Sequence, residues 1–453
     1  MRDNATHDHT RGRWSSRLGF IMAAAGSAIG LGNIWKFPYI TGMHGGGAFV
    51  LFYIFCIIMI GLPLMVAEMM LGRHTRKDPV GAFRRLKGGP WTSIGWLAVG
   101  AAFLILSYYA VIAGWAVDYL WLSLNGTISQ QQAHQVPQLF ADLLANGLGQ
   151  LFWQALFMGM TVMIVIAGVK NGLERAGKII MPIFFCILLL LAILGLFSPG
   201  GMQAVQFLFT PDWSKLTPPV MLEALGHAFF TLSLGMGAIL TYGSYVDERT
   251  SIPAMAATVS TMDTLVALLA GLAIFPIVFS YNMAPAAGPG LVFKTLPILF
   301  SQMPGGNVLA ILFFLLLVIA ALTSAISLLE VVVAYFCDEK EWSRSKATLL
   351  MGAAAFLLGV PSALSSDLLK DWHLIGDRNF LDSVDFLATN YLLPLGGLLT
   401  VVFTGWFLSG TVVQSEFEAG GTGKRFLQLW RFLIRYVSPV LVLLVLLYKA
   451  GLF

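Results

Sequence analysis

The 35 residues between Lys294 and Glu330 contain no Asp, Glu, Lys or Arg. A helix needs only about 20 predominantly apolar residues to cross the hydrocarbon region of a bilayer. Apolar stretches of sufficient length recur along the whole chain. They indicate a protein that crosses the membrane many times, rather than one large soluble core.

Composition agrees with this interpretation. Apolar residues make up 57% of the 453 and charged residues only 11%, whereas a soluble globular chain carries about 25% charged residues. We therefore expect an all-α polytopic membrane protein. Its eleven predicted spans lie near residues 17–43, 47–73, 92–124, 151–170, 176–197, 218–248, 254–281, 304–337, 346–366, 379–412 and 426–450.

The lysines and arginines indicate the direction of the spans. If the N-terminus lies in the cytoplasm, 21 of the 27 basic residues fall in cytoplasmic segments, as the positive-inside rule favours. An odd number of spans then places the C-terminus outside. The net charge of +4 is explained by this asymmetry, so we expect a lipid bilayer and no nucleic acid as partner.

Two of the predicted spans are interrupted by glycines. GSAIGLGN occupies 26–33 in span one, and FFTLSLGMGAILTY occupies 229–242 in span six. Five spans separate the start of one from the start of the other, and because five is odd, the second group of five runs in the opposite direction. Such a pair of interruptions is typical of the binding site of a secondary transporter.

We expect a single domain over 1–453. It would comprise a cytoplasmic N-terminal segment at 1–16, a first five-helix repeat at 17–197, an inverted second repeat at 218–412 and an eleventh helix at 426–450.

A helix broken at the membrane midplane presents backbone groups that an intact helix uses internally. In span one, N–H groups near Leu31 would attract an anion, and carbonyls near Ser27 would attract a cation. Span six would add carbonyls from residues 230–233. A zwitterionic amino acid together with small cations fits this arrangement. Close helix packing through Gly26 and Gly30, a G-x-x-x-G pair, is the alternative.

Polar side chains near these interruptions indicate sodium, a hard cation that prefers oxygen ligands. Asn33, Thr231 and Asp263 form one group, and a carboxylate inside a membrane span is costly and usually functional. The adjacent Thr323 and Ser324 in span eight form a second group. These two hydroxyls have an alternative role, which is to bond back to their own helix.

The same segments carry a family resemblance. RWSSRLGFIMAAAGSAIGLGNIWKFPYI, GGGAFVLFYIF and GLPLMVAEMMLGR resemble the opening of the neurotransmitter:sodium symporter family. GHAFFTLSLGMGAILTYGSY is similar to the sixth helix of that family, and ALTSAISLLE to its eighth. The resemblance implies the LeuT fold, which is a 5+5 inverted repeat with broken first and sixth helices, here with 11 transmembrane helices. It also implies sodium-coupled amino acid uptake.

Functional residues follow from this resemblance at the matching positions. The implied substrate site consists of Ala28, Gly30, Leu31, Gly32, Ile105, Tyr109, Phe230, Thr231, Ser233, Met236, Ser327 and Leu328. The implied first sodium site consists of Ala28, Asn33, Thr231 and Asp263, and the second of Gly26, Ile29, Ala320, Thr323 and Ser324. The implied gates are Lys36 with Asp385 outside, and Arg11, Trp14, Tyr245 and Asp338 inside.

Three departures from the family pattern refine the expectation. Amine carriers have an aspartate where this chain has Gly30, and glycine leaves room for the substrate's own carboxylate. Chloride-dependent members have Asn and Ser where this chain has Asp263 and Ala267, so we expect Asp263 to supply the negative charge. His227 stands where a glutamine is usual, and it either tunes the carboxylate or only packs.

The expected pocket offers no fixed charge, and the flexible Met236 could accept different side chains. We therefore predict chloride-independent symport of neutral hydrophobic L-amino acids, branched and aromatic, by alternating access. Two sodium ions would accompany each substrate across a bacterial plasma membrane. A sensor or channel on the same fold and a proton-coupled carrier are the alternatives. No enzyme is expected, because no nucleophile–base motif or phosphate loop is visible.

Overall fold

The computed structural model describes residues 12–283, 290–419, 424–449 and 451, and all regular elements of these ranges are helices. Nine of the described helices are long and apolar enough to cross a bilayer. They are Gly47–Thr75, Gly89–Leu124, Gly147–Ile166, Val169–Leu196, Ile252–Ser280, Gly306–Lys340, Arg344–Ala363, Phe380–Phe407 and Phe426–Tyr448.

The first and sixth predicted spans are each divided. α1 (Arg17–Ala28) and the segment Gly32–Met43 meet at an angle of 51° and together form a tenth candidate span. The predicted span at 218–248 consists of α12 (Pro218–Thr231) and α13 (Ala238–Gly243). Neither is long enough to cross alone, since a span needs about 20 residues. The described helices therefore reach the predicted total of eleven spans only if α12 and α13 together form the sixth span.

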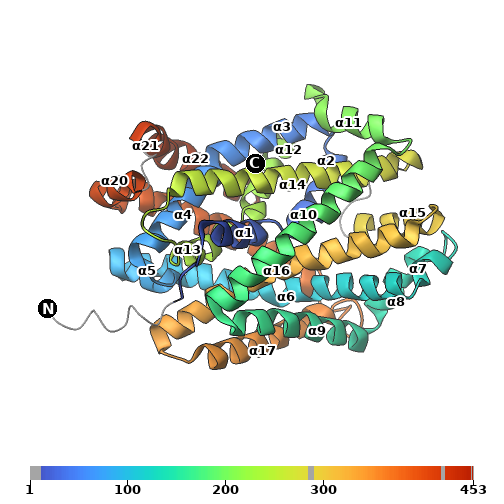
Figure 1. Cartoon of the computed structure of the whole chain (residues 1–453), viewed down its shortest axis with the longest axis horizontal. Helices are drawn as coiled ribbons and strands as arrows, with labels where there is room; N and C mark the ends of the chain where they lie inside the picture. The colour runs from blue at the N-terminus through green and yellow to red at the C-terminus, as the bar shows by residue number, and fades with distance from the viewer. Residues whose placement is uncertain (1–11, 284–289, 420–423, 450, 452–453) are drawn as a thin grey trace.

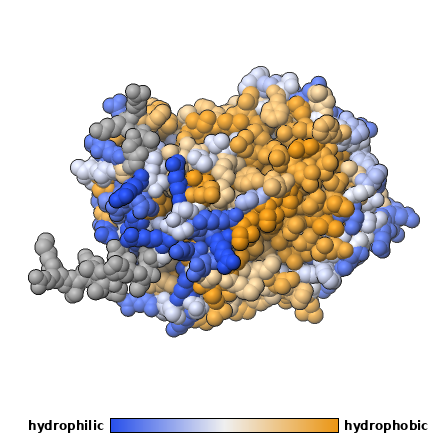
Figure 2. Space-filling model, in the orientation of Figure 1, coloured by the Kyte–Doolittle hydropathy of each residue, from blue (hydrophilic) through white to orange (hydrophobic). Residues whose placement is uncertain are grey.

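Shorter helices gather at the two ends of the bundle (Figure 1). α5 (Pro79–Leu86) and α20 (Gly410–Glu418) lie at one end, whereas α8 (Val136–Ala145) and α15 (Leu296–Gln302) lie at the opposite end. Figure 2 shows apolar side chains covering the middle of the visible face, with hydrophilic ones concentrated toward the end where α5 and α20 lie. Such an apolar band is the surface that a bilayer requires.

α1 lies inside the bundle and packs against α10 (Arg175–Leu196), α14 (Ile252–Ser280) and α16 (Gly306–Lys340). Its regular hydrogen bonding stops at Ile29, whose N–H still donates to the Ala25 carbonyl at 2.7 Å. The next free amide, Gly30 N–H, donates to the Asn33 Oδ1 atom at 3.0 Å. An asparagine side chain thus competes with the helix for a backbone donor, and the break lies where the asparagine can reach it.

The break between α12 and α13 depends on left-handed backbone. Ser233, Gly235 and Gly237 have φ angles of 54°, 80° and 74°, which glycine adopts without a steric penalty. At Gly235 a side chain would also collide, because a Cβ atom would lie 2.4 Å from the Leu393 carbonyl oxygen. The Gly235 N–H donates to the Glu68 Oε1 atom at 2.8 Å. The buried Glu68 carboxyl therefore satisfies a backbone group that the break leaves without a helical partner.

Removing this acceptor tests its contribution. We expect Glu68→Leu, which keeps most of the volume, to destabilise the folded protein by about 1–3 kcal/mol, because the buried Gly235 N–H loses its partner. Glu68→Gln keeps an acceptor oxygen and should lose much less. Thermal unfolding midpoints in detergent measure both variants, and equal midpoints for Leu and Gln would contradict the assignment.

Candidate functional site

Two cavities meet at the broken helices. The inner one measures about 30 Å³ and the outer one about 310 Å³. Leu31, Gly32, Tyr109 and Phe230 line both cavities. These four residues therefore form the boundary between a small pocket in the bundle and a larger vestibule.

The inner cavity collects nearly all of the residues expected to bind substrate. Eleven of the twelve line it: Ala28, Gly30, Leu31, Gly32, Ile105, Tyr109, Phe230, Thr231, Ser233, Met236 and Leu328. Ser327 is not among the lining residues, and Ser324, expected as a sodium ligand, is. The cavity wall has no charged side chain.

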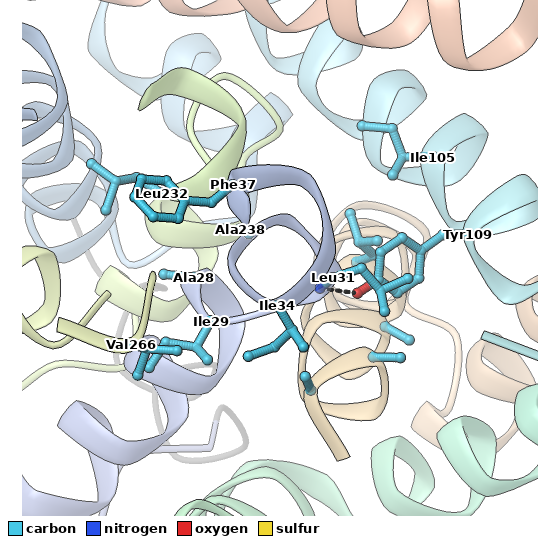
Figure 3. Close-up of a cluster of buried hydrophobic side chains, with 14 of the residues drawn as sticks. Ala28, Ile29, Leu31, Ile34, Phe37, Ile105, Tyr109, Leu232, Ala238 and Val266 are labelled. Atoms are coloured by element: carbon cyan, nitrogen blue, oxygen red, sulfur yellow. Dashed lines mark hydrogen bonds between the residues drawn. The ribbon is translucent and has the colours of Figure 1, made fainter. Parts of the chain in front are cut away.

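Backbone and hydroxyl groups meet where span one is broken. The Leu31 N–H donates to the Tyr109 hydroxyl at 3.4 Å (Figure 3). A Cβ atom on Gly30 would lie 2.5 Å from Ser324 Oγ and 3.2 Å from the Tyr109 hydroxyl. Any side chain at position 30 would therefore enter the space between two hydroxyls and the start of a half-helix, where an anion is favoured.

The first expected cation group is assembled from three spans. The Asn33 Nδ2 atom donates to Asp263 Oδ1 at 2.8 Å and to Thr231 Oγ1 at 3.0 Å. The Thr231 hydroxyl donates to Asp263 Oδ1 at 3.1 Å. All three side chains are at most 1% exposed. Within the described residues Asp263 has no Lys, Arg or His within ion-pair distance.

A buried carboxylate without a basic partner is strongly unfavourable unless it is protonated or a cation neutralises it. The described chain contains no group of three His, Cys, Asp or Glu residues that could hold a transition metal. Amide, hydroxyl and carboxylate oxygens instead suit a hard cation. A single carboxylate charge matches a monovalent ion such as sodium.

The two hydroxyls of the pair in α16 have different hydrogen-bond partners. The Thr323 hydroxyl bonds back to the Ala320 carbonyl at 3.1 Å, as the alternative expected. The Ser324 hydroxyl instead crosses to α1 and donates to the Ser27 carbonyl at 3.2 Å. Gly26 lies directly against Thr323, since a Cβ atom there would be 3.2 Å from the Thr323 Cβ atom. α1 and α16 thus meet at the second expected cation group, near Ile29 and Ala320.

His227 contacts the carboxylate site only through another side chain. Its ring lies 5.4 Å from the Tyr53 ring and 5.9 Å from the Phe37 ring, measured between centroids. Neither of its ring nitrogens has a hydrogen-bond partner within the described residues. The Tyr53 hydroxyl donates to Asp263 Oδ2 at 3.2 Å. The geometry favours packing over direct tuning of Asp263.

The two expected outer-gate residues line the vestibule together. No ion pair joins Lys36 to Asp385 in the part of the chain that the structure describes. The Lys36 Nζ atom instead lies 4.6 Å from the centroid of the Phe230 ring, a favourable cation–π distance. Asp382, one helical turn before Asp385, also lines the vestibule and was not expected there.

The segment before α1 contacts α13 and the residues that follow it. Trp14 donates from its backbone N–H to the Tyr245 carbonyl at 3.3 Å and from Nε1 to the Tyr242 carbonyl at 3.0 Å. The Tyr245 hydroxyl donates to Glu330 Oε1 at 2.8 Å, and Asp338 accepts from the Asp78 N–H at 2.9 Å. Arg11 lies outside the described residues.

A second inner contact was missed by the sequence analysis. Glu174, in the π-helical turn Val169–Glu174 that precedes α10, accepts from the Ser15 N–H at 2.7 Å and from the Ser15 and Ser16 hydroxyls at 2.5 and 3.1 Å. It also pairs with Lys178 at 2.6 Å. Glu174 lies four residues before Lys178, a spacing that indicates an ion pair on a helix. Nothing in the sequence indicated the hydrogen bonds of Glu174 with the two serines.

Buried charge at the inner ends of α16 and α17 (Arg344–Ala363) was also missed. Glu330 is 0% exposed and forms an ion pair with Arg344. The Arg344 Nε atom donates in addition to the Val165 carbonyl at 2.9 Å. The charges of this pair compensate each other, in contrast to the charge of Asp263.

Known proteins resemble the chain over nearly its whole length. The family model of the sodium:neurotransmitter symporter family matches residues 11–139 and 134–452. An uncharacterised sodium-dependent transporter, YhdH of Bacillus subtilis, is 41% identical over 97% of this chain and 98% of its own length. The sodium-dependent serotonin transporter of Drosophila melanogaster is 28% identical over 98% of this chain and 77% of its own length.

One solved structure extends the comparison to three dimensions. MhsT in complex with L-phenylalanine superposes with a TM-score of 0.89 at 45% identity, over 97% of this chain and 100% of that chain. Shared fold, motifs and length leave one assignment: the chain belongs to the sodium:neurotransmitter symporter family, whose members are secondary transporters, and it is a sodium-dependent transporter.

Proposed function

We propose that this transporter carries neutral hydrophobic L-amino acids into the cell together with two sodium ions, by alternating access. The observation that carries the proposal is the inner cavity, which has no charged side chain in its wall and borders both cation groups. A ligand that is neutral overall but carries its own two charges suits such a cavity, because half-helix ends can neutralise each charge.

The contacts support one orientation of the substrate. Its carboxylate would lie at Gly30, against the Leu31 N–H and the Tyr109 hydroxyl, and would complete the shell of the first sodium ion. Its amine would meet carbonyls at Ala28 and residues 230–233. The side chain would lie toward Ile105, Met236 and Leu328, which are all apolar. Phenylalanine in the MhsT complex supports the inclusion of aromatic substrates.

Two sodium ions with one zwitterion would carry two net charges inward. Each charge gains about 2.3 kcal/mol in a potential of 100 mV, so two supply about 4.6 kcal/mol. That free energy corresponds to a roughly thousandfold gradient of substrate. We place the N-terminus in the cytoplasm, the C-terminus outside and the protein in a bacterial plasma membrane, from the distribution of 21 of 27 basic residues.

Reconstituted liposomes test the proposal. With an inward sodium gradient and an inside-negative potential, we expect labelled leucine, isoleucine and phenylalanine to accumulate, and lysine and glutamate to remain outside. Binding without accumulation or counterflow would indicate a sensor, and passive equilibration would indicate a channel. Accumulation driven by a pH gradient without sodium would indicate a proton-coupled carrier.

Position 30 gives a sharper test of the carboxylate placement. Gly30→Ala puts a methyl group 2.5 Å from Ser324 Oγ, so the hydroxyl must move and the space for the carboxylate shrinks. We expect substrate affinity to fall at least tenfold, a loss of about 1.4 kcal/mol. Gly100→Ala is the matched control, because its Cβ atom would meet nothing within 4 Å. Equal affinity for the two variants would place the carboxylate elsewhere.

Chloride independence is assigned to Asp263. Replacing chloride by gluconate should leave uptake by the unchanged protein intact. Asp263→Asn removes the negative charge and should abolish most uptake. The double variant Asp263→Asn with Ala267→Ser should regain part of it only when chloride is present, because the anion restores the missing charge. Chloride-dependent uptake by the unchanged protein would refute the assignment.

A further inference from the structure

Four serines meet where α1 ends, and we refer to Ser27, Ser233, Ser324 and Ser327 as the four-serine cluster. Their exposed fractions are 0%, 7%, 8% and 1%. They belong to three different segments: the last turn of α1, the break of the sixth span, and α16. Buried hydroxyls need partners, and these four find them largely in one another.

The Ser27 carbonyl is the centre of the cluster. It accepts from the Ser233 hydroxyl at 2.8 Å and from the Ser324 hydroxyl at 3.2 Å. One oxygen atom at the end of α1 therefore joins the sixth span to the eighth. A carbonyl at a helix end lacks an intrahelical donor, which is why it is available to both.

The side chains of Ser27 and Ser327 form a second link between α1 and α16. The Ser27 hydroxyl donates to Ser327 Oγ at 2.8 Å, and the Ser327 hydroxyl donates to the Ser324 carbonyl at 2.8 Å. The Ser327 hydroxyl is thus used within the cluster, and Ser327 does not line the inner cavity. Its position suggests a role other than contact with a substrate side chain.

The cluster lies between two proposed sites. Ser324 lies beside Thr323 in the second cation group and also lines the inner cavity. Ser233 lines the inner cavity in a left-handed backbone conformation with φ of 54°, a strained conformation that persists only where the surrounding structure holds it. The hydrogen bond to the Ser27 carbonyl is the contact that fixes the Ser233 side chain.

We propose that Ser27, Ser233 and Ser327 are positioning residues that couple sodium at the second site to amino acid in the inner cavity. This inference rests on the proposed function. A cation on the Ser324 oxygen polarises its O–H bond and strengthens the hydrogen bond to the Ser27 carbonyl. The end of α1 is then fixed, and with it Ser233 in the cavity wall.

The coupling between sodium and amino acid binding is reciprocal, so it can be measured on either ligand. The factor by which sodium raises amino acid affinity must equal the factor by which amino acid raises sodium affinity. Hydrogen bonds that only hold the helices together would lower stability without changing this factor. Equilibrium binding of tritiated leucine at low and high sodium measures the effect of sodium on amino acid affinity. Binding of radioactive sodium with and without leucine measures the effect of the amino acid on sodium affinity.

We expect Ser233→Ala to lower the coupling factor roughly fivefold, the effect of one lost hydrogen bond. Ser233→Gly removes the same hydroxyl and also relieves the left-handed strain. It can be measured if the alanine variant folds poorly, and its coupling factor should fall as well. Ser107→Ala is the control: its buried hydroxyl donates within its own helix, to the Leu104 carbonyl at 2.6 Å, and coupling should persist.

Variants at position 327 distinguish a positioning role of Ser327 from direct contact with the substrate. Ser327→Ala should lower the coupling factor equally for leucine and phenylalanine, and Ser327→Thr, which retains a hydroxyl, should restore it. A changed preference between leucine and phenylalanine with unchanged coupling would assign Ser327 to the pocket wall and overturn its positioning role.

The outcomes distinguish the inference from the function on which it rests. If the unchanged protein binds leucine in a sodium-dependent manner and both Ser233 variants show the same coupling factor, the inference alone is wrong. If the unchanged protein binds no amino acid, or binds it equally well without sodium, the proposed function fails and the inference fails with it.

Discussion

The requirement that buried backbone groups have partners determines how this protein is built. In hydrocarbon an unpaired N–H or C=O costs several kcal/mol, so a helix can be broken there only if side chains take over its hydrogen bonds. The Asn33 side chain accepts a hydrogen bond from the Gly30 N–H, and the Glu68 carboxyl accepts one from the Gly235 N–H. The unwound segments are thereby stable enough to face a cavity, and the remaining backbone groups are available to a ligand and to cations.

Charge is distributed according to the same principle. Glu330 is compensated by Arg344 inside the protein, so that pair is structural. Asp263 receives hydrogen bonds but no positive charge from the described residues. One buried carboxylate is therefore compensated within the protein, and the other leaves a site at which a cation would be favoured.

Much of this could be predicted from the sequence. The two breaks lie within the predicted ranges 26–33 and 229–242. They could be predicted because glycines inside apolar runs, with Asn33 in the first range, signal them directly. The grouping of Asn33, Thr231 and Asp263 followed from polar side chains near the interruptions in apolar spans, and the family resemblance implied the same group. The contact of Glu174 with Ser15 could not be predicted, since it joins segments 159 positions apart that only the tertiary packing brings together. The same holds for Ser27 with Ser327, and for Lys36, whose rotamer over Phe230 depends on packing in the vestibule.

The contact at Glu174 bears on how the inner end can open. A Cβ atom on Gly19 would lie 2.1 Å from Glu174 Oε1, so the first turn of α1 lies directly on this carboxylate. To swing away, α1 must withdraw three donors from Glu174 together, and a partly solvated, partly bonded carboxylate is worse than either end state. Any movement of α1 away from α10 therefore removes the serine donors of this carboxylate and leaves it with Lys178 as its charged partner.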